Sequence, residues 1–121
     1  MPRFVVLRHE LPPGSPRGSH FDLMLEDGGV LRTWACDELP SLGQSMTADR
    51  LPDHRLAYLD YEGPISGRGE VRRVIAGDYE LIAESQDALR VRLTAENMLA
   101  LLSIQKLSEE PQRWRVSLAE G

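Results

Sequence analysis

The chain has 121 residues, a formal net charge of −5 and a single cysteine, Cys36. The negative charge argues against non-specific binding to nucleic acid, and the single cysteine excludes an internal disulfide. No apolar run approaches the roughly 20 residues that span a bilayer, and the N-terminal run is too short for a secretory signal. We therefore expect one domain over residues 1–121, in a cytoplasmic protein that does not engage a membrane.

Short apolar or alternating segments, separated by turn residues, run along most of the chain in a pattern typical of β-strands. Asp27, Gly28 and Gly29 tolerate a positive φ and predict a hairpin turn. Residues 37–53 are polar and are interrupted by two prolines, so we expect a loop there with at most one helical turn. The predicted strands are 3–9, 20–26, 29–35, 54–63, 70–77, 78–84, 88–94 and 113–118.

Residues 96–107, ENMLALLSIQKL, are compatible with two structures. Leucine, alanine and methionine favour a helix, on which Leu99, Leu102 and Lys106 have helical spacing, but the segment also alternates as a strand does. In either case, about eight closely spaced strands predict an all-β protein with at most one or two short helices. A barrel and a sandwich both fit this pattern, and we expect a small β-barrel.

The segment SHFDLMLEDGGV, residues 19–30, places an imidazole and a carboxylate on one face of a predicted strand. Phe21, Leu23 and Leu25 share one face and predict contact with the core, so His20 and Asp22 share the other face. An imidazole beside a carboxylate is a reason to look for a functional site on that face.

The three histidines, His9, His20 and His54, all lie at the ends of predicted strands, where a rigid scaffold usually presents functional groups. Two imidazoles and a carboxylate are a common ligand set for Mn, Fe or Zn. The spacing of the histidines matches no compact metal motif, so three unrelated surface histidines are the alternative interpretation.

Three segments resemble, in this order, the sequence blocks of the 3′-phosphoesterase domain of bacterial DNA ligase D. They are RFVVLRH, HFDLMLEDGGVLRTWA and DHRLAYLDYEG, and the downstream GEVRRVIAGDY fits the same family. The resemblance covers nearly the whole chain and identifies it as a stand-alone small homologue of that domain. The family belongs to the end-joining machinery that repairs double-strand breaks.

The resemblance implies a metal site in a groove of the barrel. In the family, manganese is held by residues that match His9, Asp22 and His54, although other divalent transition metals also suit this donor set. The residues that match His20 and Tyr58 act on the scissile phosphate and are the catalytic candidates. The candidate phosphate-binding residues are Arg8, Arg32 and Arg68.

Such residues can hydrolyse a phosphoester on general chemical grounds. A divalent ion polarises a phosphoryl oxygen or activates a water, while an imidazolium and a tyrosine hydroxyl donate hydrogen bonds to the other oxygens. By family analogy, the substrate is a DNA or RNA 3′ end from which a 3′-phosphate or a ribonucleoside is removed. A separately encoded DNA ligase or polymerase is a candidate partner.

Two departures from the family support an alternative hypothesis. A family arginine that clamps phosphate is replaced by Met24, and a family lysine aligns with Glu38. Each lost charge-assisted contact typically costs about 1.5–3 kcal/mol. The alternative is therefore a catalytically weakened module that binds metal and DNA ends or a repair partner. A third hypothesis is a phosphoesterase redirected to a small substrate.

Overall fold

The structure, a computed structural model, describes residues 1–109 and 112–121. Within these residues, nine strands and one short 3-10 helix make up the regular secondary structure, and no helix is long and apolar enough to span a membrane. The elements are β1 (Arg3–Glu10), β2 (His20–Asp27), β3 (Val30–Cys36), β4 (Gln44–Arg55), η1 (Leu56–Leu59), β5 (Gly63–Pro64), β6 (Glu70–Glu84), β7 (Ala88–Ala95), β8 (Met98–Ser108) and β9 (Arg113–Glu120).

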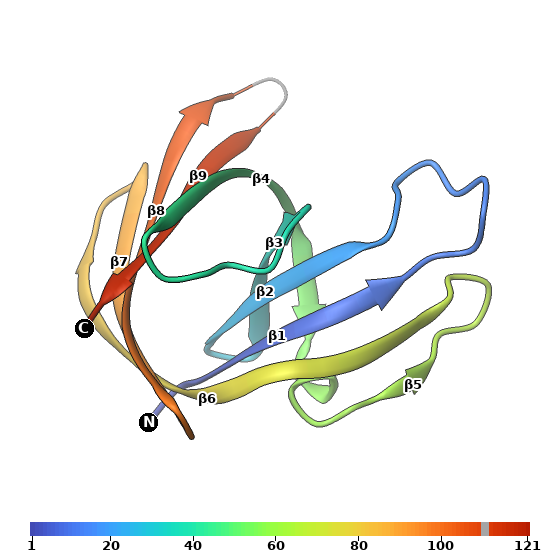
Figure 1. The fold of residues 1–121 in the computed structure, drawn as a ribbon, viewed down its shortest axis with the longest axis horizontal. Coiled ribbons are helices and arrows are strands. Elements are labelled where there is room, and N and C mark those ends of the chain that lie inside the picture. The colour runs from blue at the N-terminus through green and yellow to red at the C-terminus, as the bar shows by residue number, and fades with distance from the viewer. Residues whose placement is uncertain (110–111) are drawn as a thin grey trace.

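Eight of these strands close into an antiparallel barrel, as the sequence predicted. Their order around the barrel is β1-β2-β3-β4-β9-β8-β7-β6, and β6 pairs with β1 to complete the ring. The two-residue strand β5 adds to β6, and the predicted hairpin at Gly28 joins β2 to β3. Figure 1 shows the strands wrapping around a common interior, with both chain termini on the left of the view.

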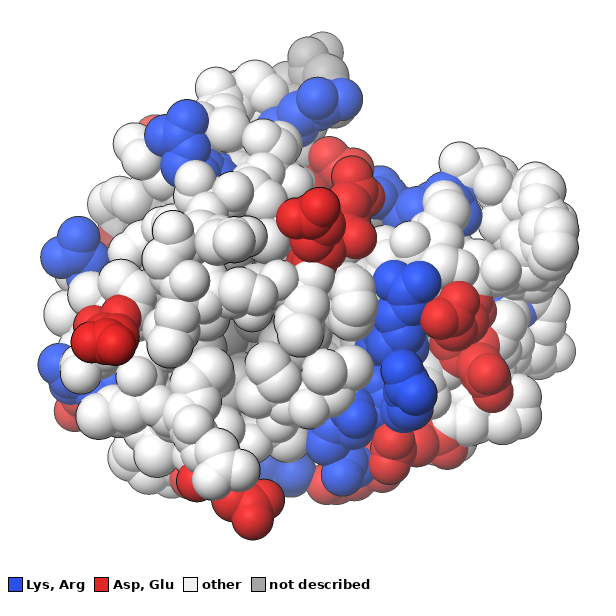
Figure 2. Space-filling view, viewed as in Figure 1, with Lys and Arg blue, Asp and Glu red and all other residues white. Residues whose placement is uncertain are grey.

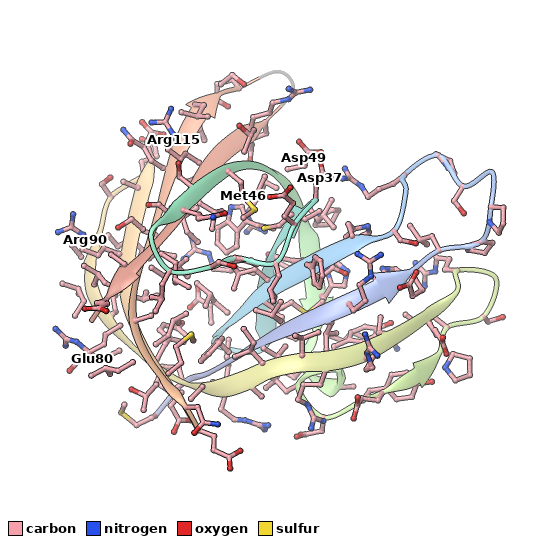
Figure 3. All side chains as sticks on the ribbon, viewed as in Figure 1. Asp37, Met46, Asp49, Glu80, Arg90 and Arg115 are labelled. Atoms are coloured by element: carbon pink, nitrogen blue, oxygen red, sulfur yellow. The ribbon has the colours of Figure 1, made fainter. Side chains whose placement is uncertain are left out.

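The main core fills the barrel because alternate side chains of each strand point inward. Trp34 of β3 and Trp114 of β9 meet edge to face in this core, with ring centroids 6.0 Å apart. Polar side chains take many of the outward positions. Figure 3 shows three of them pointing away from the barrel wall, Glu80 of β6, Arg90 of β7 and Arg115 of β9.

A second, smaller apolar cluster lies on the outer face of the barrel. Leu23 and Leu25 of β2 point into the barrel as predicted, but Met24 between them is equally buried. It packs with Leu59 of η1, and burying such side chains contributes roughly 1.5–3 kcal/mol each. This outer cluster therefore holds the segment between β4 and β6 against the barrel. Its buried members are Val5, Leu7, Met24, Leu31, Leu59 and Val71.

The prediction of a loop over residues 37–53 is wrong for its second part. Residues Gln44–Arg55 form β4, a strand with one buried residue, Ala48, that pairs with β3 on one side and β9 on the other. Pro52 is tolerated because it lies at a register shift between Leu31 and Thr33 of β3, where no ladder partner faces it. β9 pairs with Gln44–Asp49 and β3 with Ala48–Arg55, so backbone hydrogen bonds hold this polar strand in the sheet.

The prediction of a strand over residues 54–63 is also wrong. β4 ends at Arg55, and Leu56–Leu59 form η1, which a hydrogen bond from the Asp60 N–H to the Ala57 carbonyl closes at 3.1 Å. The apolar residues in this segment alternate as in a strand, but Leu56, Tyr58 and Leu59 pack together on the outer cluster. Tertiary packing thus overrides the local pattern.

The structures of β6 and β8 decide two further predictions. The predicted strands 70–77 and 78–84 are one continuous strand, β6, and residues 96–107 contain most of the strand β8 and no helix. At Gly77, β6 passes from pairing with β1 to pairing with β7, and a Cβ there would lie 2.0 Å from the Thr94 carbonyl oxygen. The glycine therefore permits a close approach of two strands and does not mark a turn.

Candidate metal centre

The pairing of β1 with β2 brings two histidines and a carboxylate together on the outer face of the barrel. His9, near the end of β1, lies directly opposite His20, and Asp22 follows on the same face of β2. The Nε2 atom of His20 is 2.9 Å from Oδ1 of Asp22, and Nδ1 of His9 is 3.4 Å from Oδ2. One nitrogen or oxygen atom from each of the three residues lies within 4.8 Å of the others.

A backbone carbonyl orients each histidine ring. Because a carbonyl only accepts, the ring nitrogen that faces it carries the hydrogen, and the other nitrogen of a neutral ring keeps a free electron pair. The opposite nitrogens are Nδ1 of His9 and Nε2 of both His20 and His54. The first two face Asp22; such a nitrogen donates to the carboxylate when its ring carries a second proton, and offers an electron pair to a metal ion when the ring is neutral. The hydrogen bonds run from His9 Nε2 to Arg68 (2.9 Å), from His20 Nδ1 to Gly18 (2.9 Å) and from His54 Nδ1 to Pro52 (2.8 Å).

Asp22 is charged although its exposure is only 2%. Burial by itself raises the pKa of this carboxyl, but the hydrogen bonds from His20 and His9 outweigh burial and lower the pKa to about 2. The hydrogen bond with Asp22 also raises the pKa of His9, and the Arg68 carbonyl acts in the same direction. The buried carboxylate therefore favours a positive charge beside it.

A small pocket opens beside this cluster. His54 reaches it because it lies opposite Leu31 at the end of β4, and Tyr58 reaches it from η1. The rings of His54 and Tyr58 meet edge to face with centroids 5.8 Å apart. One wall is thus polar and the other is formed by the outer apolar cluster. The lining residues are His9, Asp22, Met24, His54, Tyr58, Ile65, Arg68 and Val71.

The loop between β5 and β6 forms part of the pocket wall. The Ile65 N–H donates to the Gly69 carbonyl at 2.7 Å, and the Arg68 N–H donates to the Ile65 carbonyl at 2.8 Å. Gly67 and Gly69 have positive φ values of 71° and 76°, which only glycine adopts without strain. The resulting turn presents the Arg68 carbonyl to His9 and leaves the Arg68 side chain exposed at the rim.

The structure brings five predicted site residues to the pocket, with His20 in contact with Asp22 beside it, but two arginines lie elsewhere. Arg8 lies on the opposite face of β1 from His9 and pairs with Glu10 at 2.9 Å. Arg32 forms an ion pair with Glu84 at 3.0 Å. Figure 2 shows a strip of Lys and Arg atoms over the region where β1 and β6 lie in Figure 1, with Asp and Glu atoms beside it.

The donor set of the cluster fits a divalent transition-metal ion. Two imidazoles and a charged carboxylate face one another, and imidazole and carboxylate together suit Mn, Fe or Zn. Both ring nitrogens of His20 face oxygen atoms, Nδ1 the Gly18 carbonyl and Nε2 the Asp22 carboxylate. Hydrogen bonds from the outer ring nitrogens to carbonyls are also typical of metal-binding histidines.

A model of one protein family matches most of the chain. It describes the DNA ligase D 3′-phosphoesterase domain and matches residues 14–115. The chain belongs to this family. The resemblance of the chain to this family is thereby confirmed, and a comparison with curated proteins found no match.

The part of the chain that matches the ligase D 3′-phosphoesterase family carries every predicted site residue except Arg8 and His9. His9 precedes the matched residues, yet it joins the site because β1 pairs with β2 over the whole length from Phe4 to His9. The site is therefore assembled from the matched segment and from one strand before it.

Sequence reasoning assigned His54 to the metal and His20 to phosphate, whereas the compact cluster within the described residues contains His20. The sequence signal for a site that includes His20 was the position of His9 and His20 on either side of the connection 11–19. When the two flanking strands pair as a hairpin, such residues lie opposite each other. Tyr61 was missed because a strand over 54–63 would put it on the opposite face from Tyr58. In the observed turn, the two rings are in contact, with centroids 6.2 Å apart.

Proposed function

We propose that this protein is a metal-dependent phosphoesterase that acts on the 3′ ends of DNA or RNA and removes a terminal phosphate or ribonucleoside. The cluster of His9, His20 and Asp22 beside a pocket carries the proposal. Membership of the ligase D 3′-phosphoesterase family supports a nucleic-acid end as substrate. A 3′-hydroxyl product suits DNA repair by end joining, with a separately encoded ligase or polymerase as partner.

In this proposal, His9, His20 and Asp22 hold the metal, for which manganese is our choice. When bound, the ion supplies Lewis acidity toward a phosphoryl oxygen or an activated water. His54 and Tyr58 line the pocket and can donate hydrogen bonds to the remaining phosphoryl oxygens, His54 from Nε2 when its ring is protonated. The geometry supports this exchange of the roles that the resemblance gave to His20 and His54.

A second candidate is a module that binds metal and DNA ends with little catalysis. Met24, which replaces the family arginine, is 1% exposed and packs in the outer cluster, so it brings no charge to the pocket. Glu38 is exposed after β3 and lies outside the pocket lining. Arg68 is the one guanidinium among the lining residues, so it is our candidate to serve in place of the lost arginine.

The test is an end-processing assay with matched variants. A 5′-labelled primer-template, whose primer ends in a 3′-phosphate or a single ribonucleotide, is incubated with Mn²⁺, with Mg²⁺ and chelator as controls. Asp22→Asn keeps the size of the side chain and removes its charge. We expect it to lower the rate by a factor of roughly 100 or more. Asp87→Asn changes an exposed aspartate between β6 and β7 and should keep the wild-type rate.

Binding of Mn²⁺, followed by electron paramagnetic resonance, separates the two candidates. Turnover that Asp22→Asn abolishes supports the phosphoesterase, whereas Mn²⁺ binding without turnover supports the binding module. A wild-type protein that binds no Mn²⁺ contradicts both. His20→Gln should weaken Mn²⁺ binding more than His54→Gln, and the reverse order would restore the roles that the resemblance implied.

A further inference from the structure

We propose that the ring of Tyr61 is a stacking subsite for the base of the terminal nucleoside, next to the metal pocket. This inference rests on the proposed function and deepens it, because it states what the substrate contacts beyond its phosphate. The substrate class is then a base-bearing nucleotide end and not a bare sugar phosphate.

The pocket beside the metal cluster is too small to enclose a nucleoside. Its volume is about 50 Å³. Pockets that enclose small organic ligands measure roughly 300–1,000 Å³. The pocket therefore has room for phosphoryl oxygens and little else. The sugar and the base of a nucleotide bound there must lie on the surface around it.

Tyr61 lies at the edge of this pocket and its ring is held in place. The ring meets that of Tyr58, a lining residue, at an interplanar angle of 85° with centroids 6.2 Å apart. The Tyr61 hydroxyl donates a hydrogen bond to the Pro64 carbonyl, and the next residue, Ile65, also lines the pocket. Because both ends of the side chain are fixed, little conformational entropy is lost when a base stacks on it.

Tyr61 is also the aromatic side chain most accessible to a base. Its exposure is 39%, whereas four of the other aromatic residues are buried in the core. Phe21 is partly exposed, but the Arg8 guanidinium lies 4.8 Å from its ring centroid. Every base has a π-face, so stacking on Tyr61 is expected to tolerate all four bases. The buried aromatic residues are Phe4, Trp34, Tyr79 and Trp114.

The acidic residues on either side of Tyr61 are engaged by donors. The Asp60 carboxylate forms an ion pair with Arg3 at 2.8 Å, and the Glu62 carboxylate accepts the backbone N–H of Arg73 at 2.9 Å. These contacts reduce the repulsion that the two carboxylates exert on a nucleotide phosphate. The Arg68 side chain at the pocket attracts the same phosphate, so the local charge does not oppose binding at this edge.

The test compares two primer-templates that differ only in the terminal base, one ending in a nucleotide 3′-phosphate and the other in an abasic sugar 3′-phosphate. Tyr61→Leu removes the ring, whereas Tyr61→Phe keeps it and removes the hydroxyl. We expect Tyr61→Leu to raise KM for the base-bearing end roughly 5- to 150-fold, with kcat little changed. KM for the abasic end should not change. Tyr61→Phe keeps the ring but loses its bond to the Pro64 carbonyl, so its KM for the base-bearing end should lie between those of the wild type and Tyr61→Leu.

An equal effect of Tyr61→Leu on both ends, or no effect on either, overturns the stacking subsite. Failure of the proposed function has a different signature, because the wild type then turns over neither end. In that case, fluorescence anisotropy measures the affinity of the protein for the same two oligonucleotides and tests the subsite without turnover. A preference for the base-bearing end that Tyr61→Leu abolishes supports the subsite, and equal wild-type affinities overturn it. Leu99→Ala, at a 53% exposed position on β8, is the surface control.

Discussion

Replacing Gly69 with alanine should damage both the fold and the candidate metal centre, because its position leaves no room for a side chain. A Cβ on Gly69 would lie 1.8 Å from the Glu10 carbonyl oxygen, and ordinary contacts begin at 3.4 Å, so the loop and β1 must separate by 1.6 Å. Such a separation breaks the 2.9 Å hydrogen bond from His9 to the Arg68 carbonyl. The free ring nitrogen of His9 then loses its fixed direction.

The size of the effect follows from strain and lost hydrogen bonds. Alanine at a positive φ costs roughly 1–2 kcal/mol, and the hydrogen bonds to His9 and within the turn contribute roughly 0.5–1.5 kcal/mol each. Gly69→Ala should therefore lower the free energy of unfolding by about 2–5 kcal/mol. Gly67→Ala carries the same strain, but nothing lies within 4 Å of its Cβ, so about 1–2 kcal/mol is expected.

Urea unfolding followed by circular dichroism measures the stability of both variants, and titration with Mn²⁺ under folded conditions measures the site. Loss of an orienting contact outside the metal ligands typically lowers metal affinity 10- to 100-fold, so Gly69→Ala should bind Mn²⁺ correspondingly more weakly than Gly67→Ala. Equal losses of stability in the two variants would refute the steric argument. A destabilised Gly69→Ala that binds Mn²⁺ as tightly as Gly67→Ala would refute the coupling between the loop and His9.

Three further predictions concern buried groups. The pKa of Asp22 is lowered from 3.8 to about 2, so its contribution of roughly 2 kcal/mol is complete above pH 3.8 and is lost as the pH falls toward 2. The free energy of unfolding of Asp22→Asn should therefore fall less between pH 4 and pH 2 than that of the wild type. An equal fall in the two proteins would contradict the lowered pKa of Asp22. Burial, assisted by Asp22 and Asp37, raises the pKa of Cys36 to about 12, so native protein at pH 8 should resist a disulfide reagent that labels the unfolded chain at once. Met24→Arg should destabilise the protein by roughly 3 kcal/mol or more, because a guanidinium would replace an apolar side chain that is 1% exposed in the outer cluster, whereas Met24→Leu should cost less than about 1.5 kcal/mol. Similar urea midpoints for the two Met24 variants would disprove this account of the cluster.

The barrel could be predicted because its strands carry local signals. Alternation along β2 correctly places Leu23 and Leu25 in the core, and His20 and Asp22 on the other face. The turn at Gly28 also follows from residue type alone. These features depend on neighbouring residues in the chain, which is the information that a single sequence contains most directly.

The features that could not be predicted depend on contacts between distant segments. β4 has a polar sequence and is a strand because β3 and β9 pair with it on both sides. Tyr58 lies in a 3-10 turn because Leu56 and Leu59 pack on the outer cluster, whose other members come from β1, β2, β3 and β6. The distance between His9 and Asp22 likewise depends on a register that neither strand specifies alone.

The direct pairing of His9 with His20 also determines where the protein tolerates added sequence. Both histidines are held by the sheet, and a 2.9 Å hydrogen bond from the Leu11 N–H to the Ser19 hydroxyl closes the base of the connection between them. Doubling the length of a flexible loop costs only about 0.6 kcal/mol. A peptide inserted at Gly14, where nothing lies within 4 Å of an added Cβ, therefore leaves the cluster in place. Engineered tags or targeting modules can thus be carried beside the site without redesign of the barrel.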